Sequence, residues 1–471
     1  MIKIYNTLTK QKEELVPLNP PNIRMYMCGP TVYDYFHIGN ARSFIMSDIV
    51  RRYLEYKGYQ VTFVMNLTDV DDKIIKKSIE ENKPAKEVSE FYVREFFNDI
   101  EKLKIKKATH YPKATEFMNE MIEMIKKLED KGIAYNKDGN VFYDVSKFSE
   151  YGKLSGKNID ELEAGSRVEI NEEKKHPLDF ALWKKAKEGE PYWDSPWGKG
   201  RPGWHIECSA MSCNLLGESF DIHAGGHDLI FPHHENEIAQ SEAANNKPFV
   251  KYWLHFGFLN INEEKMSKSL GNFFTARDIL KQYSAEAIRL FFAQAHYRGP
   301  LNFSEDLVKA AEKGIEKIQN SYNRINEELK NKNFSPKDVD FNFNQWYEKF
   351  EQAMDDDFNT SSAVAVIFDF SREINKAIDD DNISEQFLTN AKNFFDNVAE
   401  GVFGLLKSDL DYSSTSLEEE LIEILIKIRN DAKQEKNYAL SDRIRDELNN
   451  IGIVLQDSKS GTTYKKIKKL N

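Results

Sequence analysis

The sequence predicts an α/β protein in which a parallel sheet comes first and a set of helices follows. Apolar, strand-like segments at 23–28 and 60–66 flank a segment with helical spacing at 40–57, which is the pattern of a parallel strand, helix, strand crossover. The same alternation returns between 221 and 259. After about residue 300 the pattern changes to successive amphipathic helices, which is typical of a helical bundle.

Length and composition agree with a folded chain of several domains. The 471 residues exceed one ordinary core, and 40% hydrophobic with 30% charged residues is typical of a globular protein. The sequence shows no apolar run long enough to span a membrane and no signal-peptide pattern at its start, so we expect a cytoplasmic protein without a membrane partner. Only three cysteines occur, too few for a disulfide framework, so each is a core thiol or a candidate ligand.

Two further segments complete the predicted organisation. Residues 115–200 have mixed character, with one amphipathic helix, short extended pieces and a turn-rich end, and we interpret them as an insertion in the sheet domain. A polar, serine-rich linker at 408–416 precedes a last unit that ends in a lysine-rich tail. The net charge of −12 disfavours a non-specific polyanion binder unless basic residues are clustered, and composition alone favours a solvated tail.

The turn after the first strand carries the first chemical signal. His37 and Gly39 stand just before the predicted helix, within the stretch HIGN. A turn between a parallel strand and its helix directs backbone N–H groups and the positive helix end to one point, where phosphate binds readily. Glycine allows close approach there, and imidazole can donate to a phosphoryl oxygen. Alone, this motif also fits a surface histidine beside a turn.

The second signal is KMSKSLGN at 265–272, where Lys265 and Lys268 lie in a glycine-terminated loop. Such a loop can close over a polyphosphate, although a lysine pair on its own also fits a solvated basic loop. HIGN followed by KMSKS resembles the paired signatures of class I aminoacyl-tRNA synthetases. Further motifs, among them MYMCGPTVYDYFHIGNAR, NLTDVDDKII, RPGWHIECSAM, PHHENEIAQSEA and DDDFNT, narrow the resemblance to the cysteinyl-tRNA synthetase family over essentially the whole chain.

The resemblance implies a zinc ion, one per chain, in the amino-acid pocket. Cys28, Cys208, His233 and Glu237 fall on the zinc-ligand positions of that family. Independently, His233 and Glu237 are four residues apart, on one face of a helix. Spacing alone leaves His234 as an alternative ligand, and the family pattern selects His233. Without the resemblance, Cys28 and Cys208 would be interpreted as buried core residues, and Cys213 keeps that interpretation.

The resemblance also assigns the substrates and the reaction. It implies that the ionised carboxylate of L-cysteine attacks ATP, which is bound with Mg²⁺, and that cysteinyl-adenylate then charges tRNA(Cys). His37, Asn40, Lys265 and Lys268 would be catalytic, and Gly39 would bind ATP together with His37 and Lys268. The expected cysteine-binding residues are Gly29, Thr31, Thr68, Trp204, His205 and Asp228. We interpret Asp69, Asp71 and Asp72 as a helix start.

The domains implied by the resemblance follow the sequence pattern. We expect a Rossmann-type catalytic domain at 1–114 and 201–300, with a connective insertion at 115–200, a helical bundle that contacts the tRNA stem at 301–409, and a small mixed anticodon-binding unit at 410–471. In the last unit the expected tRNA contacts are Arg443, Arg445, Lys465 and Lys466. Tyr464 stands where many relatives carry tryptophan. We expect a monomer.

Two alternative functions remain open on sequence. One is a ligase that transfers activated cysteine to a small amine, although the chain continues for about 170 residues after the catalytic core. The other is a tRNA-binding protein without catalysis, which would be expected to have lost His37, Lys268 or a zinc ligand. All of these residues are present. ATP–pyrophosphate exchange across the amino acids distinguishes the alternatives.

Overall fold

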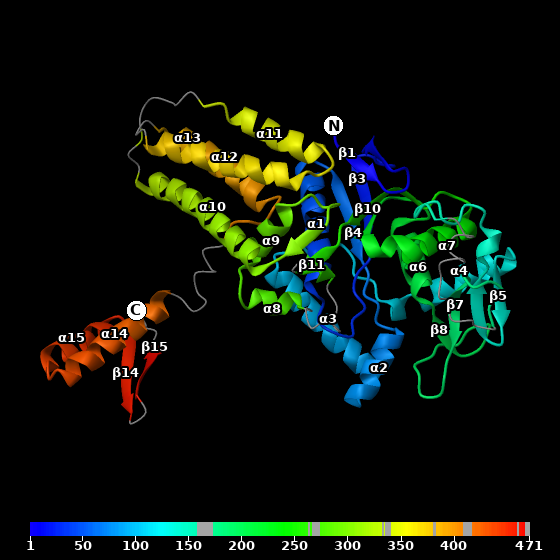
Figure 1. Cartoon of the computed structure of the whole chain (residues 1–471), viewed down its shortest axis with the longest axis horizontal. Coiled ribbons are helices and arrows are strands. Elements are labelled where there is room, and N and C mark those ends of the chain that lie inside the picture. The colour runs from blue at the N-terminus through cyan, green and yellow to red at the C-terminus, as the bar shows by residue number, and fades with distance from the viewer. Residues whose placement is uncertain are drawn as a thin grey trace. The chain divides into compact units, whose positions relative to one another are not determined.

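The structure is a computed structural model that describes residues 1–157, 173–261, 264–265, 274–331, 334, 341–379, 383–407, 417–458 and 461–466. The chain divides into two compact units, Met1–Leu406 and Lys407–Asn471, each described by itself below. Figure 1 follows the chain through both.

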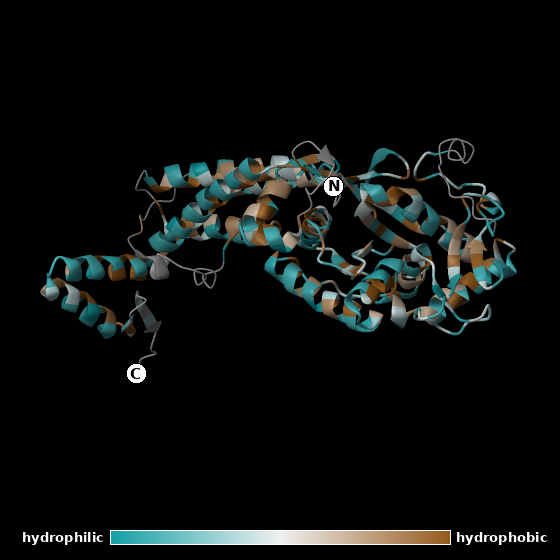
Figure 2. Cartoon of the chain, turned by 60° about the horizontal axis from the view of Figure 1, so that its bottom comes forward, coloured by the Kyte–Doolittle hydropathy of each residue, from teal (hydrophilic) through white to brown (hydrophobic). Residues whose placement is uncertain are grey.

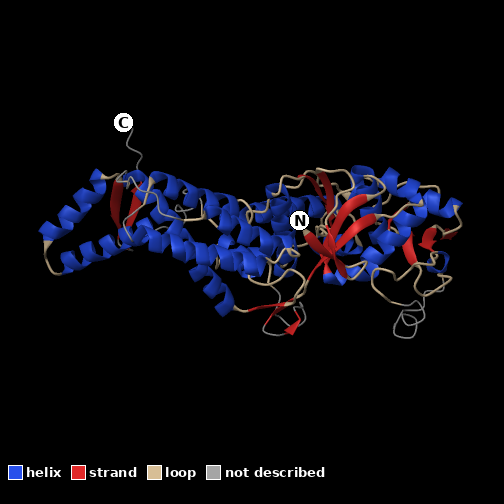
Figure 3. Ribbon diagram, turned by 90° about the horizontal axis from the view of Figure 1, so that it is seen from above, coloured by secondary structure: helices blue, strands red, loops and turns tan. Residues whose placement is uncertain are grey.

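The first unit is built on a parallel sheet, as the sequence predicts. Its four strands lie in the order β10-β9-β3-β4, and all neighbours are parallel. The strands are β3 (Asn22–Met27), β4 (Gln60–Met65), β9 (Phe220–Gly226) and β10 (Val250–Phe256). Their apolar, β-branched residues are buried on both faces because helices cover the sheet. Figure 3 shows these strands among the surrounding helices.

The connections of this sheet fix where ligands can bind. Helix α1 (Ile38–Tyr56) connects β3 to β4 on one side, and a long excursion returns the chain to β9 on the other side of β3. The order in which strands are added to the sheet therefore reverses between β3 and β9, although the strands stay parallel. Open α/β sheets bind ligands at such a point, just beyond the carboxyl ends of the strands. After β4 come α2 (Asp72–Glu81) and α3 (Ala85–Lys102).

The long excursion contains the insertion. Helix α4 (Met118–Asp130) precedes a second sheet of four antiparallel strands in the order β5-β6-β7-β8, and α6 (Trp204–Leu216) leads back to β9. The strands are β5 (Ala134–Lys137), β6 (Asn140–Tyr143), β7 (Phe180–Lys185) and β8 (Gly200–Pro202). This part has its own apolar core, in which Trp183 is fully buried.

A small sheet and a helical bundle follow β10. Strands β11 (Leu259–Ile261), β12 (Glu264–Lys265) and β13 (Leu301–Phe303) form a sheet in which β11 is central. The sequence predicts only helices between residues 301 and 409, so β13 is a difference. A strand of three residues carries too little pattern to be predicted. The helices are α8 (Ala276–Leu280), α9 (Ala285–Ala293), α10 (Glu305–Asn331), α11 (Phe343–Asp355), α12 (Thr360–Asp379) and α13 (Glu385–Phe394).

The bundle shares its core with the sheet domain. Phenylalanines of α11–α13 pack with α1 residues such as Tyr53 in one continuous apolar cluster. The bundle helices carry hydrophilic residues along part of their surface (Figure 2), as amphipathic helices do. An N-terminal hairpin of β1 (Lys3–Asn6) and β2 (Gln11–Glu14) joins the same body, because Asp357 accepts a hydrogen bond from Tyr5 N at 2.7 Å.

The second unit is a small α/β module. It contains α14 (Leu417–Gln434), α15 (Tyr438–Asn450) and an antiparallel hairpin of β14 (Ile453–Ser458) and β15 (Gly461–Lys466). Ile422, Leu448 and Ile453 form its core. None of the helices in the described parts of the chain is apolar and long enough to cross a bilayer.

Candidate active site and metal centre

A cavity of about 540 Å³ opens at the carboxyl ends of the central strands. Residues that directly follow β3, β9 and β10 line it, and Lys73 of α2 contributes after β4. Of the residues predicted from the sequence, the cavity is lined by Cys28, Gly29, Thr31, His37, Gly39, Asn40, Trp204 and Asp228. The predicted phosphate-binding turn and much of the predicted amino-acid pocket therefore face one space.

His37 caps the helix that forms one wall. It is the N-cap residue of α1, in extended conformation, and its Nδ1 accepts a hydrogen bond from the backbone N–H of Asn40 at 3.1 Å. Because Nδ1 is an acceptor, the proton of the neutral ring is on Nε2. The first turn of α1 contains no acidic residue, so no carboxylate of the helix itself neutralises its positive end, which suits an anion.

Gly29 is required by a close backbone approach at the strand end. Its N–H donates to Asn66 Oδ1 at 2.9 Å, and a Cβ at this position would lie 1.8 Å from the carbonyl oxygen of Asn66. Any side chain here would push apart the segments that follow β3 and β4. Thr31 and Thr68 are joined by a β-bridge just beyond, so the two loops form one wall.

Thr68, like His205, is placed differently from the predicted cysteine contacts that line the cavity. It is buried, 2% exposed, and is not among the residues that line the cavity. Its hydroxyl donates to Glu207 Oε2 at 2.9 Å and accepts from Asn66 Nδ2 at 3.2 Å. Burial raises the pKa of the Glu207 carboxyl well above its usual range. Glu207, which the sequence pattern did not single out, thus orients the Thr68 hydroxyl by accepting its hydrogen bond.

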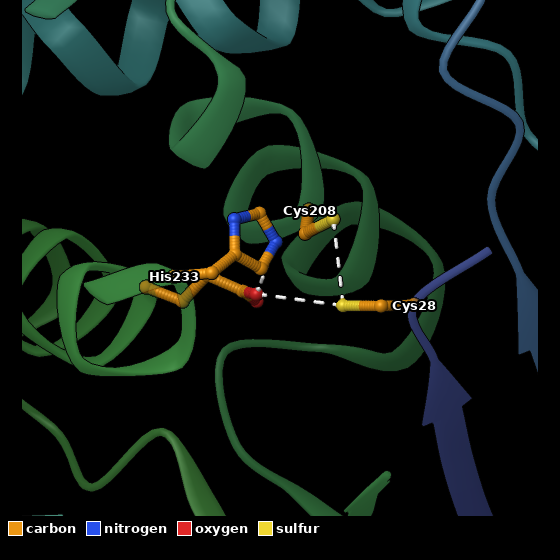
Figure 4. A group of neighbouring side chains, drawn as sticks. Cys28, Cys208 and His233 are labelled. Carbon is orange, nitrogen blue, oxygen red and sulfur yellow. Dashed lines mark hydrogen bonds and ion pairs between the residues drawn. The ribbon is translucent and has the colours of Figure 1, made fainter. Parts of the chain in front are cut away.

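The four predicted metal ligands come together beside the cavity. Cys28 follows β3, and Cys208 lies in α6. His233 lies in a π-helical turn (Ile230–His234) that contains Pro232, and Glu237 lies in the helix that follows, α7 (Glu235–Asn245). All four are buried, with one candidate ligand atom each, and these atoms lie within 4.8 Å of one another. Figure 4 shows Cys28, Cys208 and His233 turned toward one point.

The distances between these ligand atoms suit an ion with tetrahedral coordination. Cys28 Sγ lies 3.9 Å from Cys208 Sγ and 3.6 Å from Glu237 Oε1, and His233 Nε2 lies 3.0 Å from Glu237 Oε1. Bonds of about 2.0–2.3 Å to zinc separate tetrahedral ligands by roughly 3.3–3.8 Å. Two thiols, an imidazole and a carboxylate are a donor set that zinc accepts.

The ionised groups in this cluster favour the binding of a cation. Burial opposes ionisation of Glu237, yet the neighbouring His223 and His233 lower its pKa to about 2. A hydrogen bond from Cys28 lowers the pKa of the Cys208 thiol to about 6. Burial disfavours a charged His233, but Glu237 and Cys208 raise its pKa to about 10. A metal ion would bind the ionised Glu237 and Cys208 directly and would displace the proton that His233 carries at neutral pH.

A second set of donors overlaps the first. Cys28 and Glu237 also converge with His223 and His234, again within 4.8 Å. Because both sets use Cys28 and Glu237, an ion held by one set would compete for these two ligands with an ion held by the other. His233 lies beside the cavity, where its ring packs at a tilt of 32° against cavity-lining Trp204, 4.2 Å between centroids. His234 lies farther inside, with Nδ1 2.8 Å from Nε2 of His255.

The remaining neighbours of the cluster orient its ligands. His205 Nδ1 lies 2.9 Å from His233 Nδ1, which leaves His233 Nε2 toward Glu237. His223 Nε2 contacts Glu237 Oε2 at 2.8 Å. Such outer partners fix the direction of metal ligands. Sequence analysis found His205 and missed His223 and His255, whose only signal is a histidine inside an otherwise apolar strand.

The other predicted residues are less fully described. Lys268 lies outside the described residues, and for Lys265 only the strand β12 is described. In the second unit, Arg443 and Arg445 are exposed on α15, and Lys465 and Lys466 end β15. Tyr464 lines a hollow of about 460 Å³ with Lys427, Asn430 and Thr462.

The fold is that of the class I tRNA synthetases. Methionyl-tRNA synthetase of Mycobacterium tuberculosis superposes with a TM-score of 0.59 at 13% identity, over 81% of this chain and 89% of that one. The leucyl enzyme of Agrobacterium radiobacter K84, in a ternary complex with tRNA, gives 0.59 at 10% identity, over 83% of this chain and 85% of that one.

Sequence comparison identifies the branch of this class. The family model "tRNA synthetases class I (C) catalytic domain" matches residues 14–313, and the "DALR domain" model matches residues 349–407. A Cysteine--tRNA ligase of Clostridioides difficile (strain 630) is 52% identical over 471 residues, which is 99% of this chain and 100% of that protein. The chain belongs to the cysteine-specific family of class I tRNA synthetases.

Proposed function

We propose that this protein activates L-cysteine with ATP and transfers it to tRNA(Cys). The observation that carries the proposal is the soft donor cluster of Cys28, Cys208, His233 and Glu237 beside a cavity whose other wall is the start of α1. One wall suits a thiol held through a metal and the other suits phosphate. The identity of 52% over the full length with a Cysteine--tRNA ligase supports the same activity.

The metal would select the amino acid. Zinc held by Cys28, Cys208, His233 and Glu237 would supply a direct bond to the thiolate of cysteine, which the hydroxyl of serine cannot match. A pocket of ordinary shape separates two such similar side chains poorly. Trp204, which is 40% exposed, and His205 would form the wall around the side chain. Discrimination at binding would make an editing site unnecessary.

The amino and carboxyl ends of cysteine would be held by the loops after β3, β4 and β9. We assign Asp228, which lines the cavity, to the substrate ammonium, and Thr31 and the backbone of Gly29 to its main chain. Thr68 would support the wall that carries Thr31, with its hydroxyl oriented by Glu207. A fixed carboxylate can attack the α-phosphorus of ATP without a protein nucleophile, so catalysis would come from positioning and charge stabilisation.

Charge that develops on the phosphates would be stabilised by the HIGN turn and the KMSKS loop. His37 Nε2–H would donate to a phosphoryl oxygen, because Nδ1 is already engaged by Asn40 N–H. Gly39 and Asn40 complete this end of the cavity. Lys265 and Lys268 would neutralise the polyphosphate together with the Mg²⁺ that accompanies ATP. Lys268→Ala should lower the adenylation rate by roughly 10²–10³-fold, the usual loss for one donor to the transition state.

The helical part and the second unit would bind the tRNA. The exposed Arg443 and Arg445, with Lys465 and Lys466, supply positive charge for phosphate contacts. Tyr464 in its hollow, beside Asn430, offers an aromatic face for an unstacked base and a polar group for its edge. A monomer would suffice, since the site is assembled from one chain.

ATP–pyrophosphate exchange tests the proposal directly. Exchange should depend on cysteine and not on serine, and charging should require tRNA(Cys). Exchange that depends on another amino acid would contradict the assignment of the pocket. Cysteine-dependent exchange without tRNA charging, but with transfer to a small amine, would favour the ligase alternative.

A further inference from the structure

Arg42 is a buried cation that ties two distant loops to the first turns of α1. It lies four residues after Ile38, the first residue of that helix, and is 1% exposed. Its Nη1 donates to the carbonyl oxygens of Gly257 at 2.7 Å and Phe258 at 2.8 Å. Its Nη2 donates to Gly299 O at 2.6 Å and reaches His296 O at 3.4 Å. One guanidinium therefore joins four carbonyl groups from two segments.

The partners of Arg42 are unusual for a buried charge. Within the described ranges of the chain, its hydrogen-bond acceptors are all backbone carbonyls, and its Nε has no partner. Burial lowers the pKa of the guanidinium to about 10, so it remains positive at neutral pH. Only the carbonyl dipoles offset the loss of hydration. The planar fork of arginine can serve two segments at once, which the single ammonium of lysine cannot do.

The segment that Arg42 holds is a wall of the cavity. Gly257, Phe258 and Leu259 line the cavity together with His37, Gly39 and Asn40 of the HIGN turn. The same segment continues into β11 and then β12, which ends at Lys265. Arg42 thus connects the helix start that suits phosphate with the strand that leads to the KMSKS residues.

Backbone contacts hold this wall in addition to the burial of Leu259 in the apolar core. Gly257 N donates to Tyr297 O at 2.8 Å, and Leu301 N donates to Phe258 O at 3.0 Å. A Cβ on Gly257 would lie 2.2 Å from Gly299 O, so the two segments touch through their main chains. Phe258 is 42% exposed, and its ring meets His227 edge-on at 5.1 Å between centroids. The guanidinium between the carbonyl groups is the charged link that holds these segments to α1.

We propose that Arg42 is a positioning residue that sets the distance between the HIGN turn and the wall Gly257–Leu259, and thereby the affinity for ATP. The inference rests on the proposed function. It concerns the nucleotide end of the cavity, because Arg42 contacts none of the four metal ligands and none of the residues assigned to cysteine. Its loss should therefore affect ATP more than cysteine.

The test compares Arg42→Lys and Arg42→Met with Arg51→Met in cysteine-dependent ATP–pyrophosphate exchange. Arg51 is the control, since it is also buried on α1 and donates to a backbone carbonyl, Lys107 O, at 2.7 Å. It differs from Arg42 in pairing with Glu55 at 3.1 Å, and it does not line the cavity. We expect KM for ATP to rise roughly 10- to 100-fold in both Arg42 variants, the effect of a misplaced wall. KM for cysteine should stay within about twofold.

Zinc content and Tm are measured on the same preparations. A KM does not depend on the fraction of folded enzyme, so a general loss of stability cannot imitate the expected split, and Arg51→Met should lower Tm without producing it. An unchanged KM for ATP in Arg42→Lys, or equal rises in both KM values, would overturn the inference. If wild-type protein shows no cysteine-dependent exchange, the proposed function fails, and calorimetric titration with ATP tests Arg42 separately.

Discussion

His37 Nδ1 accepts a hydrogen bond of 3.1 Å from the backbone N–H of Asn40, so the histidine of the HIGN turn is also the N-cap of α1. Nδ1 stabilises the helix, and Nε2 carries the proton of the neutral ring. The two roles can be separated by substitution, because asparagine caps helices well and has no group that reaches as far as Nε2.

His37→Asn should lose catalysis and keep the cap, whereas His37→Ala should lose both. We expect the adenylation rate to fall by roughly 10²-fold or more in each variant, as for other transition-state donors. Only His37→Ala should also lose stability, by about 0.5–2 kcal/mol. Single-turnover adenylation and urea unfolding measure the two effects. A normal rate in His37→Asn would contradict the assigned role of Nε2.

Cys208→Ser should abolish stoichiometric zinc, whereas Cys213→Ser should leave it near one per chain. Both residues lie on α6, but Cys213 contacts Asn245 rather than the cluster, and burial raises the pKa of its thiol to about 12. Elemental analysis of purified protein measures the stoichiometry. Equal zinc in the two variants would show that the metal, if any, is bound elsewhere. His233→Ala and His234→Ala then distinguish the two overlapping donor sets.

Glu207→Gln should weaken cysteine binding with little effect on ATP. In this variant an amide takes the place of the carboxyl group that accepts the hydrogen bond from Thr68. The Thr68 hydroxyl would therefore lose its fixed orientation. We expect KM for cysteine to rise about tenfold, the loss of roughly one hydrogen bond. Separate titrations of the two substrates in the exchange assay check this split. A rise for ATP alone would place Glu207 outside the amino-acid pocket.

The second unit should become less stable in acid. Arg429 makes paired hydrogen bonds of 2.9 and 2.8 Å to the carboxylate of Asp457, and Lys433 adds a third at 2.8 Å. Hydrogen bonding from these cations holds the pKa of Asp457 well below its usual range. A carboxyl whose pKa is lower in the folded state stabilises the fold above its unfolded pKa of about 3.9 and loses this effect as pH falls toward the folded value.

Because the Asp457 side chain is 48% exposed, solvent screens the pair, and we expect an effect of about 1 kcal/mol or less. Urea unfolding of a fragment of residues 407–471 between pH 7 and pH 3, followed by circular dichroism, measures it. The matched variant Asp457→Asn should be less stable at pH 7 and should lose less on acidification. If both proteins lose the same free energy of unfolding between pH 7 and pH 3, Asp457 is not the source of the acid sensitivity.

Removal of residues 407–471 should separate the two activities. The truncation ends between the two compact units, and the cavity and the donor cluster lie wholly in the first. Cysteine-dependent exchange should persist, while charging of tRNA(Cys) should fall sharply with the basic contacts of α15 and β15. Both assays use one truncated preparation. Undiminished charging would show that the second unit does not bind tRNA.

The sequence predicted much of the site because strand ends converge in a parallel sheet. HIGN and Cys28 follow one strand, and Asp228 and His233 follow another, so the topology brings them together once the strands are recognised. The choice between His233 and His234 depended on resemblance, since both are close to Glu237 in sequence, and the structure brings each of them near it.

Other features carry no pattern that a sequence can display. The acceptors of Arg42 are backbone carbonyls, which every residue possesses, so nothing in residues 257–258 or 296–299 marks them as its partners. Glu207 was missed because a carboxylate beside a cysteine in a helix is ordinary until burial is known. Thr68 was expected in the cavity, but its placement depends on the register of the loop after β4.

The order of strands in the central sheet also has a consequence during protein synthesis. β3 is complete at Met27, but its partner β9 ends only at Gly226, so one side of β3 has no neighbour while the intervening residues are made. At about 5–20 residues per second this takes roughly 10–40 s. An unpaired, apolar strand edge is prone to aggregation. A nascent chain that stalls within the insertion should therefore need chaperones, and one that stalls beyond β10 should not.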